Sequence, residues 1–121
     1  MLHEDVANFL PLSPAVFHVM VSLADGSRHG YAIIKDVAER TDGAERLGAG
    51  TLYAIIKRLL ADNLITEIER AEDGAKADQR RRYYRLTALG RHVATAEAER
   101  LERAVASARS SRLLPSSRSA H

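Results

Sequence analysis

The feature that most restricts the fold is the stretch of residues 64–86, in which two strand-like runs flank a polar tip. The first run, LITEIER, contains two β-branched isoleucines, and the second, RRRYYRL, contains two tyrosines among four arginines. The segment between them, AEDGAKADQ, is polar and carries a glycine, which is typical of a hairpin turn. Because a lone two-stranded hairpin is not stable in water, these strands must pack against the rest of the chain.

Helix signals lie on both sides of this hairpin. Ser13 followed by Pro14 predicts a helix start, because serine caps a free amide and proline has no amide to leave unpaired. Asn63 predicts a helix end, and Thr87 predicts the cap of a last, long helix. The order is three short helices, a hairpin and a long helix. It predicts a mainly α fold with a small β-hairpin, the winged helix-turn-helix plan followed by a C-terminal helix.

The chain has 121 residues, enough for one domain with short extensions. We expect an N-terminal extension at 1–12, a winged helix-turn-helix domain at 13–86 and a dimerisation helix at 87–110. Residues 111–121 are rich in serine and arginine and contain a proline, so we expect a disordered basic tail there.

Composition excludes several classes of protein. Apolar residues make up 45% of the chain and charged residues 28%, which indicates a folded protein. There is no cysteine, so disulfides, thiolate metal sites and cysteine nucleophiles are excluded. The first residues do not resemble a leader, and no apolar run approaches the roughly 20 residues of a membrane span. We therefore expect a cytoplasmic protein. The net charge is only +2, so a polyanionic partner must be inferred from where the charges lie.

The predicted third helix, from about Gly50 to Asp62, has two contrasting faces. One face is apolar, and the opposite face places small residues at its centre and basic residues beside them. Such a face suits a helix in the major groove, because small residues permit close approach while long basic side chains reach phosphates or base edges. An ordinary amphipathic surface helix gives the same pattern, and the helix alone does not decide between them. The residues of the outward face are Gly50, Thr51, Tyr53, Ala54, Lys57, Arg58 and Ala61.

The second strand of the hairpin concentrates positive charge. Residues 80–85 hold four arginines and no acid. Because strand side chains alternate, Tyr84 and Leu86 are predicted to face the core with Arg82 on the same side. Arg81 and Arg85 are then predicted to face outward.

The first strand contains acids that could form ion pairs with these arginines. An antiparallel register sets Glu69 opposite Arg81 and Glu67 opposite Tyr83. In one interpretation the two glutamates pair with Arg81 and Arg85, and such exposed pairs contribute only about 0–1 kcal/mol each. In the other, the hairpin contacts a polyanion. The register leaves Arg80 and Arg82 without opposing acids, and both are expected near the tip together with Lys76. The acids of the same loop, Glu72, Asp73 and Asp78, weaken the positive field there.

The last helix carries an apolar stripe at helical spacing. Nothing after it in the sequence covers this stripe, which favours a second subunit as its partner. Packing against the first helix of the same chain is the alternative, and the two are compatible. The stripe consists of Leu89, Val93, Leu101, Ala104, Val105 and Ala108.

Catalysis and metal binding find no support in the sequence. None of the five histidines makes an i, i+4 pair, so an intrachain metal site is not expected. His29 stands at a helix start, where a capping role is expected. Glu97, Glu99 and Glu102 are interpreted as a solvated helix face. We expect no enzyme activity, no metal and no cofactor.

Three segments together resemble the PadR-type transcriptional regulators. They are HGYAIIKDVAERT, LGAGTLYAIIKRLLADNLI and RRRYYRLTALGR, in that order and spacing. The resemblance implies a dimeric winged-helix repressor of the compact subfamily. It would bind a near-palindromic operator and be released by a small-molecule effector that the sequence does not identify.

The resemblance also implies roles for particular residues. Tyr31 would touch the DNA backbone, and Thr51, Tyr53, Lys57 and Arg58 would lie on the recognition helix. Ala49 stands where the family usually has proline. The chain has no tryptophan, so the stacking of flat drugs between tryptophans, which some compact members use, is not expected.

The leading hypothesis is therefore a homodimeric, sequence-specific regulator that binds a double-stranded DNA operator. Because the net charge is low, a winged-helix module that binds protein is an alternative, and a non-specific architectural DNA binder is another. The predicted DNA-binding residues are Tyr31, Gly50, Thr51, Tyr53, Ala54, Lys57, Arg58, Lys76, Arg80, Arg81 and Arg82.

Overall fold

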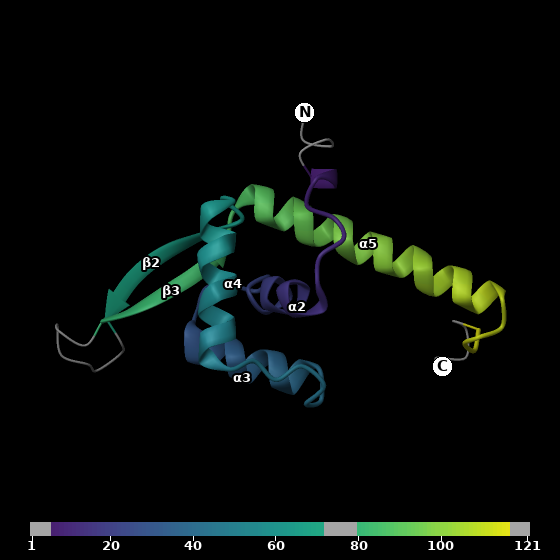
Figure 1. Ribbon diagram of the computed structural model, residues 1–121, viewed down its shortest axis with the longest axis horizontal. Coiled ribbons are helices and arrows are strands. Elements are labelled where there is room, and N and C mark those ends of the chain that lie inside the picture. Colours follow the sequence, from purple (N-terminus) through teal and green to yellow (C-terminus); the bar gives the residue numbers. More distant parts are fainter. Residues whose placement is uncertain (1–5, 72–79, 117–121) are drawn as a thin grey trace.

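The computed structural model describes residues 6–71 and 80–116 (Figure 1). Three short helices gather into a bundle, and the hairpin of strands 65–71 and 80–86, which we call the wing, projects to one side of it. A long last helix extends beyond the bundle on the other side. This is the mainly α winged helix-turn-helix arrangement that the sequence predicts. The elements are α2 (Pro14–Ser22), β1 (Arg28–His29), α3 (Gly30–Arg40), α4 (Ala49–Ala61), β2 (Ile65–Ala71), β3 (Arg80–Leu86) and α5 (Ala88–Ser110).

Local capping fixes where three of the helices begin. The Ser13 hydroxyl oxygen accepts the Val16 amide at 3.3 Å, with Pro14 at the first helical position of α2. The Thr87 Oγ1 accepts the Gly90 amide at 2.9 Å at the start of α5. His29 Nδ1 accepts the Ala32 amide at 3.2 Å and caps α3. Each cap satisfies an amide that the first helical turn leaves unpaired.

The hydrophobic core lies where α2, α3 and α4 meet the base of the sheet and the first half of α5. Burying one such apolar side chain contributes about 1.5–3 kcal/mol, so the whole set outweighs any surface ion pair. Tyr84 belongs to this core, as the strand alternation predicts. The core residues are Val19, Met20, Leu23, Ile33, Val37, Leu47, Leu52, Ile56, Leu59, Leu64, Ile65, Tyr84 and Val93.

The sheet has three strands where the sequence predicted a two-stranded hairpin. Its order is β1-β3-β2, with every pair antiparallel. Arg28 pairs with Tyr84 and His29 pairs with Tyr83. A two-residue strand is too short to carry an alternating pattern, so β1 could not be predicted from the sequence.

The register of the hairpin differs by one residue from the predicted one. Glu67 lies opposite Tyr84 and Glu69 lies opposite Arg82. The prediction was wrong because the register is set at the base, where buried Ile65 pairs with Leu86. A one-residue shift moves side chains to the other face of the sheet, so the expected pairs of Glu67 and Glu69 with the outward arginines do not form.

The described part of the N-terminal segment, residues 6–12, packs against the core. Val6, Phe9, Leu10 and Leu12 are partly buried against the core. Figure 1 shows the N-terminal segment crossing α5 before it enters α2. Its apolar side chains cover core surface that would otherwise face water.

Helix α5 uses its apolar stripe in two ways. Val93 is fully buried within its own chain and packs in the core, so it is not available to a partner as the sequence predicted. Leu101 and Val105 are 36% and 39% exposed further along the helix.

After α5 the chain turns back, with Arg109 Nε donating to the Pro115 carbonyl at 2.9 Å. The expected disordered tail is thus a defined turn as far as residue 116, and its last residues, 117–121, lie outside the described residues.

Glu97 corrects the interpretation of the α5 acids. It is 1% exposed, and Arg100 donates to both of its carboxylate oxygens at 2.8 and 2.7 Å. The Arg100 hydrogen bond lowers the pKa of Glu97, burial opposes this, and a hydrogen bond from the Leu12 amide adds to it. The i, i+4 spacing from Val93 already placed Glu97 on the buried stripe, a signal that the sequence interpretation missed.

Within the described residues, none of the helices combines the length and the hydropathy that a membrane crossing requires.

Candidate nucleic-acid interface

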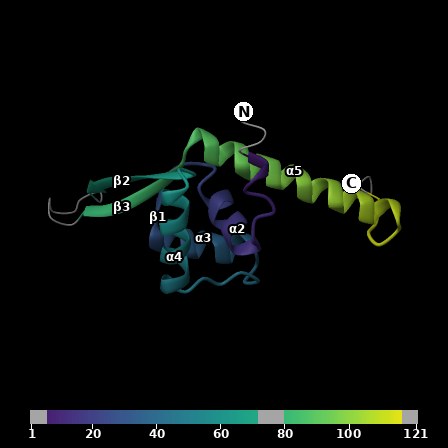
Figure 2. The same cartoon turned by 45° about the horizontal axis from the view of Figure 1, so that its top comes forward.

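Helix α4 presents the small and basic face that the sequence predicts. Leu52, Ile56 and Leu59 are buried on one side. The helix lies beside the sheet and packs on α3 (Figure 2). The residues on its exposed side are Gly50, Thr51, Tyr53, Ala54, Lys57, Arg58 and Ala61.

A cleft of about 370 Å³ lies between the start of α3, the first half of α4 and β3. Tyr31, 68% exposed, and Tyr53, 49% exposed, stand on its helical sides. Arg81 and Arg82 stand on the side of the wing. The cleft therefore brings together residues that lie about fifty positions apart in the sequence and that were each predicted to contact DNA.

Gly30 lets the two helices of this cleft approach closely. A Cβ atom at position 30 would overlap the hydroxyl group of Tyr53. The Tyr53 side chain therefore lies against the start of α3, and its position is fixed by packing while about half of its surface remains exposed.

His29 connects the start of α3 to the wing. The Arg81 Nη1 lies 3.1 Å from Nε2 and 3.4 Å from Nδ1 of His29, so the guanidinium group sits over the imidazole ring. The Tyr83 ring meets the same imidazole edge-on, with centroids 5.3 Å apart. The sequence predicted the capping role of His29 but not these contacts, because they depend on β1 pairing with β3.

The wing arginines are placed differently from the prediction. Arg82 was expected to lack an acid on the opposing strand, but its Nε lies 3.5 Å from Glu67 Oε2. The corrected register brings the two residues to the same face. Arg82 is still 67% exposed, so this pair is weak and leaves the guanidinium group open to solvent. Lys76 lies outside the described residues, and so does the side chain of Arg80.

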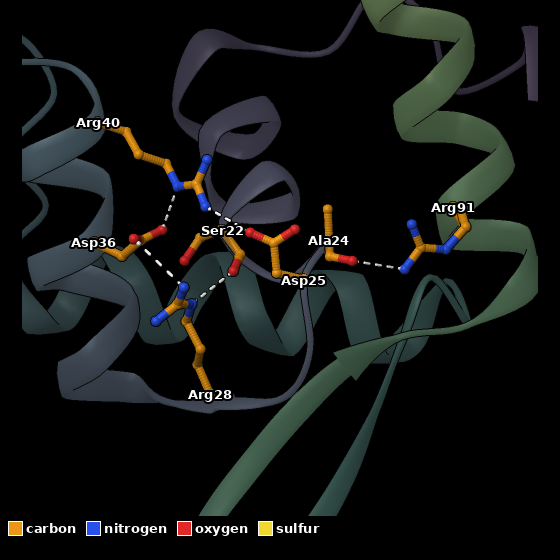
Figure 3. Close-up of polar contacts among 7 residues, drawn as sticks. All are labelled: Ser22, Ala24, Asp25, Arg28, Asp36, Arg40 and Arg91. Carbon is orange, nitrogen blue, oxygen red and sulfur yellow. Dashed lines mark hydrogen bonds and ion pairs between the residues drawn. The ribbon is translucent and has the colours of Figure 1, made fainter.

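A network of ion pairs fixes the turn that leads into β1 (Figure 3). Arg40 Nε donates to Asp36 at 2.7 Å, and Arg40 Nη2 donates to Asp25 at 3.0 Å. Arg28 donates to the Ser22 carbonyl at 2.7 Å, and its Nη2 lies 3.5 Å from Asp36. Because Arg28 precedes His29 directly, the network also holds the histidine beside the wing.

Asp36 is the centre of this network. Burial raises the pKa of its carboxyl, but the hydrogen bond from Arg40 and the charges of Arg28 and Arg40 outweigh burial and keep the pKa below its ordinary value. In addition, Arg91 of α5 donates to the Ala24 carbonyl at 2.9 Å (Figure 3), which ties the same turn to the last helix.

The described part of the chain contains no group of three or more metal-ligating acids, histidines or cysteines.

Residues 19–96 match the family model described as the transcriptional regulator PadR-like family. The chain belongs to this family. The match covers α3, α4, the wing and the first part of α5, and so includes every element that lines the cleft. The family consists of transcription regulators, so this PadR-like protein is a transcriptional regulator.

Two curated relatives have similar sequences. Transcriptional regulator Rv3488 of Mycobacterium tuberculosis is 33% identical over 85 residues, which are 70% of this chain and 73% of that protein. An uncharacterised 37.1 kDa protein of transposon TN4556 from Streptomyces fradiae is 40% identical over 85 residues. The chain spans only 22% of the length of that second relative.

Solved structures share the fold. A PadR family transcription regulator from Clostridium difficile R20291 has a TM-score of 0.69 and 26% identity, covering 81% of this chain and 97% of that one. Bacillus subtilis PadR, solved in complex with operator DNA, has a TM-score of 0.61 and 19% identity over 75% of this chain and 47% of that one. The second likeness concerns the fold alone.

Proposed function

We propose that this PadR-like regulator acts as a homodimer that binds a near-palindromic DNA operator in a sequence-specific way, as a repressor released by a small-molecule effector. One observation carries the proposal: the exposed small and basic face of α4 adjoins a cleft that the wing arginines and two exposed tyrosines share. The operator complex of Bacillus subtilis PadR, a protein of the same fold, supports it.

The residues of the interface divide into two roles. Gly50 and Ala54 carry almost no side chain, so α4 can lie close to the floor of the major groove, where Lys57 and Arg58 reach to either side. Tyr53 is held against Gly30 and presents a fixed ring toward the bases. In this arrangement α4 selects the sequence.

The second role is to hold the DNA backbone. Tyr31, Arg81 and Arg82 line the cleft beside α4 and are placed to contact phosphates of the adjoining backbone. The sequence adds Lys76 and Arg80 to the proposed contact, although Lys76 and the side chain of Arg80 lie outside the described residues. These contacts supply affinity and salt dependence but little sequence information.

The homodimer rests on the second half of α5. Leu101, Ala104 and Val105 are exposed along one side of the helix, and the Leu113 and Leu114 side chains after it are exposed as well. Pairing with a second copy would remove this apolar surface from water. A two-fold axis would then place two α4 helices on half-sites about 34–36 Å apart.

Fluorescence anisotropy with two labelled duplexes tests the proposal. One duplex carries the promoter region upstream of the gene, and the other has the same base composition in scrambled order. We expect binding to the promoter at least about 1000-fold tighter than to the scrambled duplex at physiological salt. Equal affinity for both duplexes would indicate an architectural DNA binder, and no salt-dependent binding to either would reject DNA as the partner.

A further inference from the structure

A second cavity, of about 300 Å³, lies between the N-terminal segment and the C-terminal half of α4. We call it the N-terminal cavity. It is separate from the cleft and lies on the other side of α4. Phe9 and Leu12 of the N-terminal segment, Val16 of α2 and Leu59 of α4 form apolar walls. Its volume falls at the lower end of the range that small-molecule sites occupy.

Two opposite charges stand at this cavity. Arg58 and Asp62 both line it and lie four residues apart at the end of α4, so they share one side of the helix. Within residues 6–71 and 80–116 they do not pair with each other or with any other charged side chain. The cavity therefore offers one cation and one anion beside apolar walls, and Asn8 and Ser13 add polar atoms to its lining.

This combination restricts the chemistry of a ligand. A simple carboxylate would pair with Arg58 but meet the negative charge of Asp62, and a simple amine would meet the reverse problem. A molecule with a carboxylate, an ammonium group and an apolar side chain pairs with both charged residues, and its apolar side chain packs against the apolar walls. We propose that the N-terminal cavity binds a free amino acid with an apolar side chain, carboxylate on Arg58 and ammonium on Asp62.

The walls of the cavity connect such a ligand to two elements, α4 and, through the N-terminal segment, α5. The Leu12 amide donates to the buried carboxylate of Glu97, so the wall formed by the N-terminal segment is attached to α5. The opposite wall is α4 itself. A ligand carboxylate on Arg58 would compete with a DNA phosphate for the same guanidinium group. This coupling, unlike the site itself, rests on the proposed DNA-binding function.

Isothermal titration calorimetry on the full chain without DNA tests the site. The probes are L-leucine, 4-methylpentanoate, which lacks the amine, and 3-methylbutylamine, which lacks the carboxylate. We expect L-leucine to bind about tenfold or more tightly than either truncated probe, because each probe loses one hydrogen-bonded charge. Absence of saturable heat with L-leucine, or equal affinity for all three probes, would overturn the proposal.

Variants locate the binding. Asp62→Asn should weaken L-leucine by about tenfold and leave 4-methylpentanoate as tight or tighter. Val16→Phe should fill the cavity and abolish binding of every probe. Asp42→Asn, a matched change at an exposed residue away from this cavity, should leave all affinities unchanged. If circular dichroism shows that Val16→Phe does not fold, Asp62→Asn alone decides. A ratio of L-leucine affinity to 4-methylpentanoate affinity that is the same in Asp62→Asn as in wild type would refute the site.

Anisotropy with the promoter duplex then separates the two proposals. L-leucine is expected to weaken DNA binding by wild type about tenfold at saturation, and Asp62→Asn should need about tenfold more L-leucine for the same effect. Calorimetric binding of L-leucine in a protein that binds no DNA would support the site and reject the DNA-binding function. DNA binding without any L-leucine heat would reject the site and leave that function intact.

Discussion

At the scale of single residues, the interface depends on side chains that serve two elements at once. His29 caps α3 through Nδ1 while the guanidinium group of Arg81 rests over its ring. Tyr53 lies on α4 but is positioned by Gly30 of α3. Each of these residues therefore sets the placement of one surface element relative to another, beyond any contact of its own with DNA.

Substitution of His29 separates its two roles. His29→Ala removes the cap and the ring, and should lower the free energy of unfolding by about 1 kcal/mol in urea titrations. His29→Asn keeps a good capping side chain and should recover most of this stability. Both variants should weaken promoter binding, because neither supplies a ring for Arg81. Wild-type affinity in His29→Asn would show that the ring does not position the wing.

Lys57 offers a direct test of phosphate contact. Lys57→Ala should weaken binding to promoter and scrambled duplexes by similar factors and reduce the slope of log K against log salt by about one. Arg103→Ala, which removes an exposed cation on α5 away from the apolar stripe, is the matched control and should leave the slope unchanged. Equal slopes for Lys57→Ala and wild type would exclude this lysine from phosphate contact.

At the scale of elements, contacts between neighbouring segments set the position of the wing relative to the helices. The Asp25–Arg28–Asp36–Arg40 network fixes the turn before β1, and β1 in turn pairs with β3 of the wing. At the base of the hairpin, α5 packs closely on Leu64, which precedes β2. The wing is therefore held at its base from both sides.

The free energy of unfolding should depend on pH through the titration of Asp36. Because the pKa of Asp36 is lower in the folded chain than its ordinary value of 3.8, its stabilisation is fully present above that value. It is lost as the pH falls through the lowered folded-state pKa. Asp36→Asn should therefore cost about 2 kcal/mol near neutral pH, and the difference from wild type should shrink below about pH 4 in urea titrations. A difference that stays constant down to pH 2 would contradict this role.

Two glycines provide a matched pair for α5 and α4. A Cβ at Gly90 would overlap the Leu64 carbonyl oxygen, whereas a Cβ at Gly50 would meet open space. Gly90→Ala should therefore lower the free energy of unfolding by about 3 kcal/mol, because a backbone atom has little freedom to move away. Gly50→Ala should keep or raise stability, since alanine favours helix, yet weaken promoter binding. Thermal melts followed by circular dichroism measure the first effect and anisotropy the second.

At the scale of the whole molecule, α5 divides its length between two tasks. Its first half completes the core through Val93. Its second half projects from the domain (Figure 1), and Leu101 and Val105 on it are exposed. This division places the proposed dimer contact well away from α4. The dimer can therefore set the spacing of two α4 helices without altering the surface of either.

A charge on the exposed stripe should separate the subunits. Val105→Asp should raise the dissociation constant of the dimer by on the order of 100-fold, because an aspartate would be buried without a partner. Sedimentation velocity over a concentration series measures this. Ser107→Asp adds the same charge on an exposed position off the stripe and should leave the dimer intact. A wild-type chain that sediments as a monomer at every concentration would reject the dimer.

The sequence by itself determined the features that neighbouring residues control. Ser13, Thr87 and His29 were identified at helix starts because a cap acts over three residues of chain. The two faces of α4 and the inward position of Tyr84 follow from the helical and strand periods, and the structure has them as predicted. Most of the proposed interface residues were predicted in this way, because they are the outward positions of regular elements.

The tertiary structure alone decided what depends on distant segments meeting. The pairing of Ile65 with Leu86 set the register, which brought Glu67 to Arg82 and corrected the predicted ion pairs. Packing of the N-terminal segment against α5 buries Glu97. Periodicity says which side of an element is apolar but not which segment covers it. The N-terminal cavity and the contact of His29 with Arg81 therefore had no sequence signal, because each exists only where remote parts of the chain pack together.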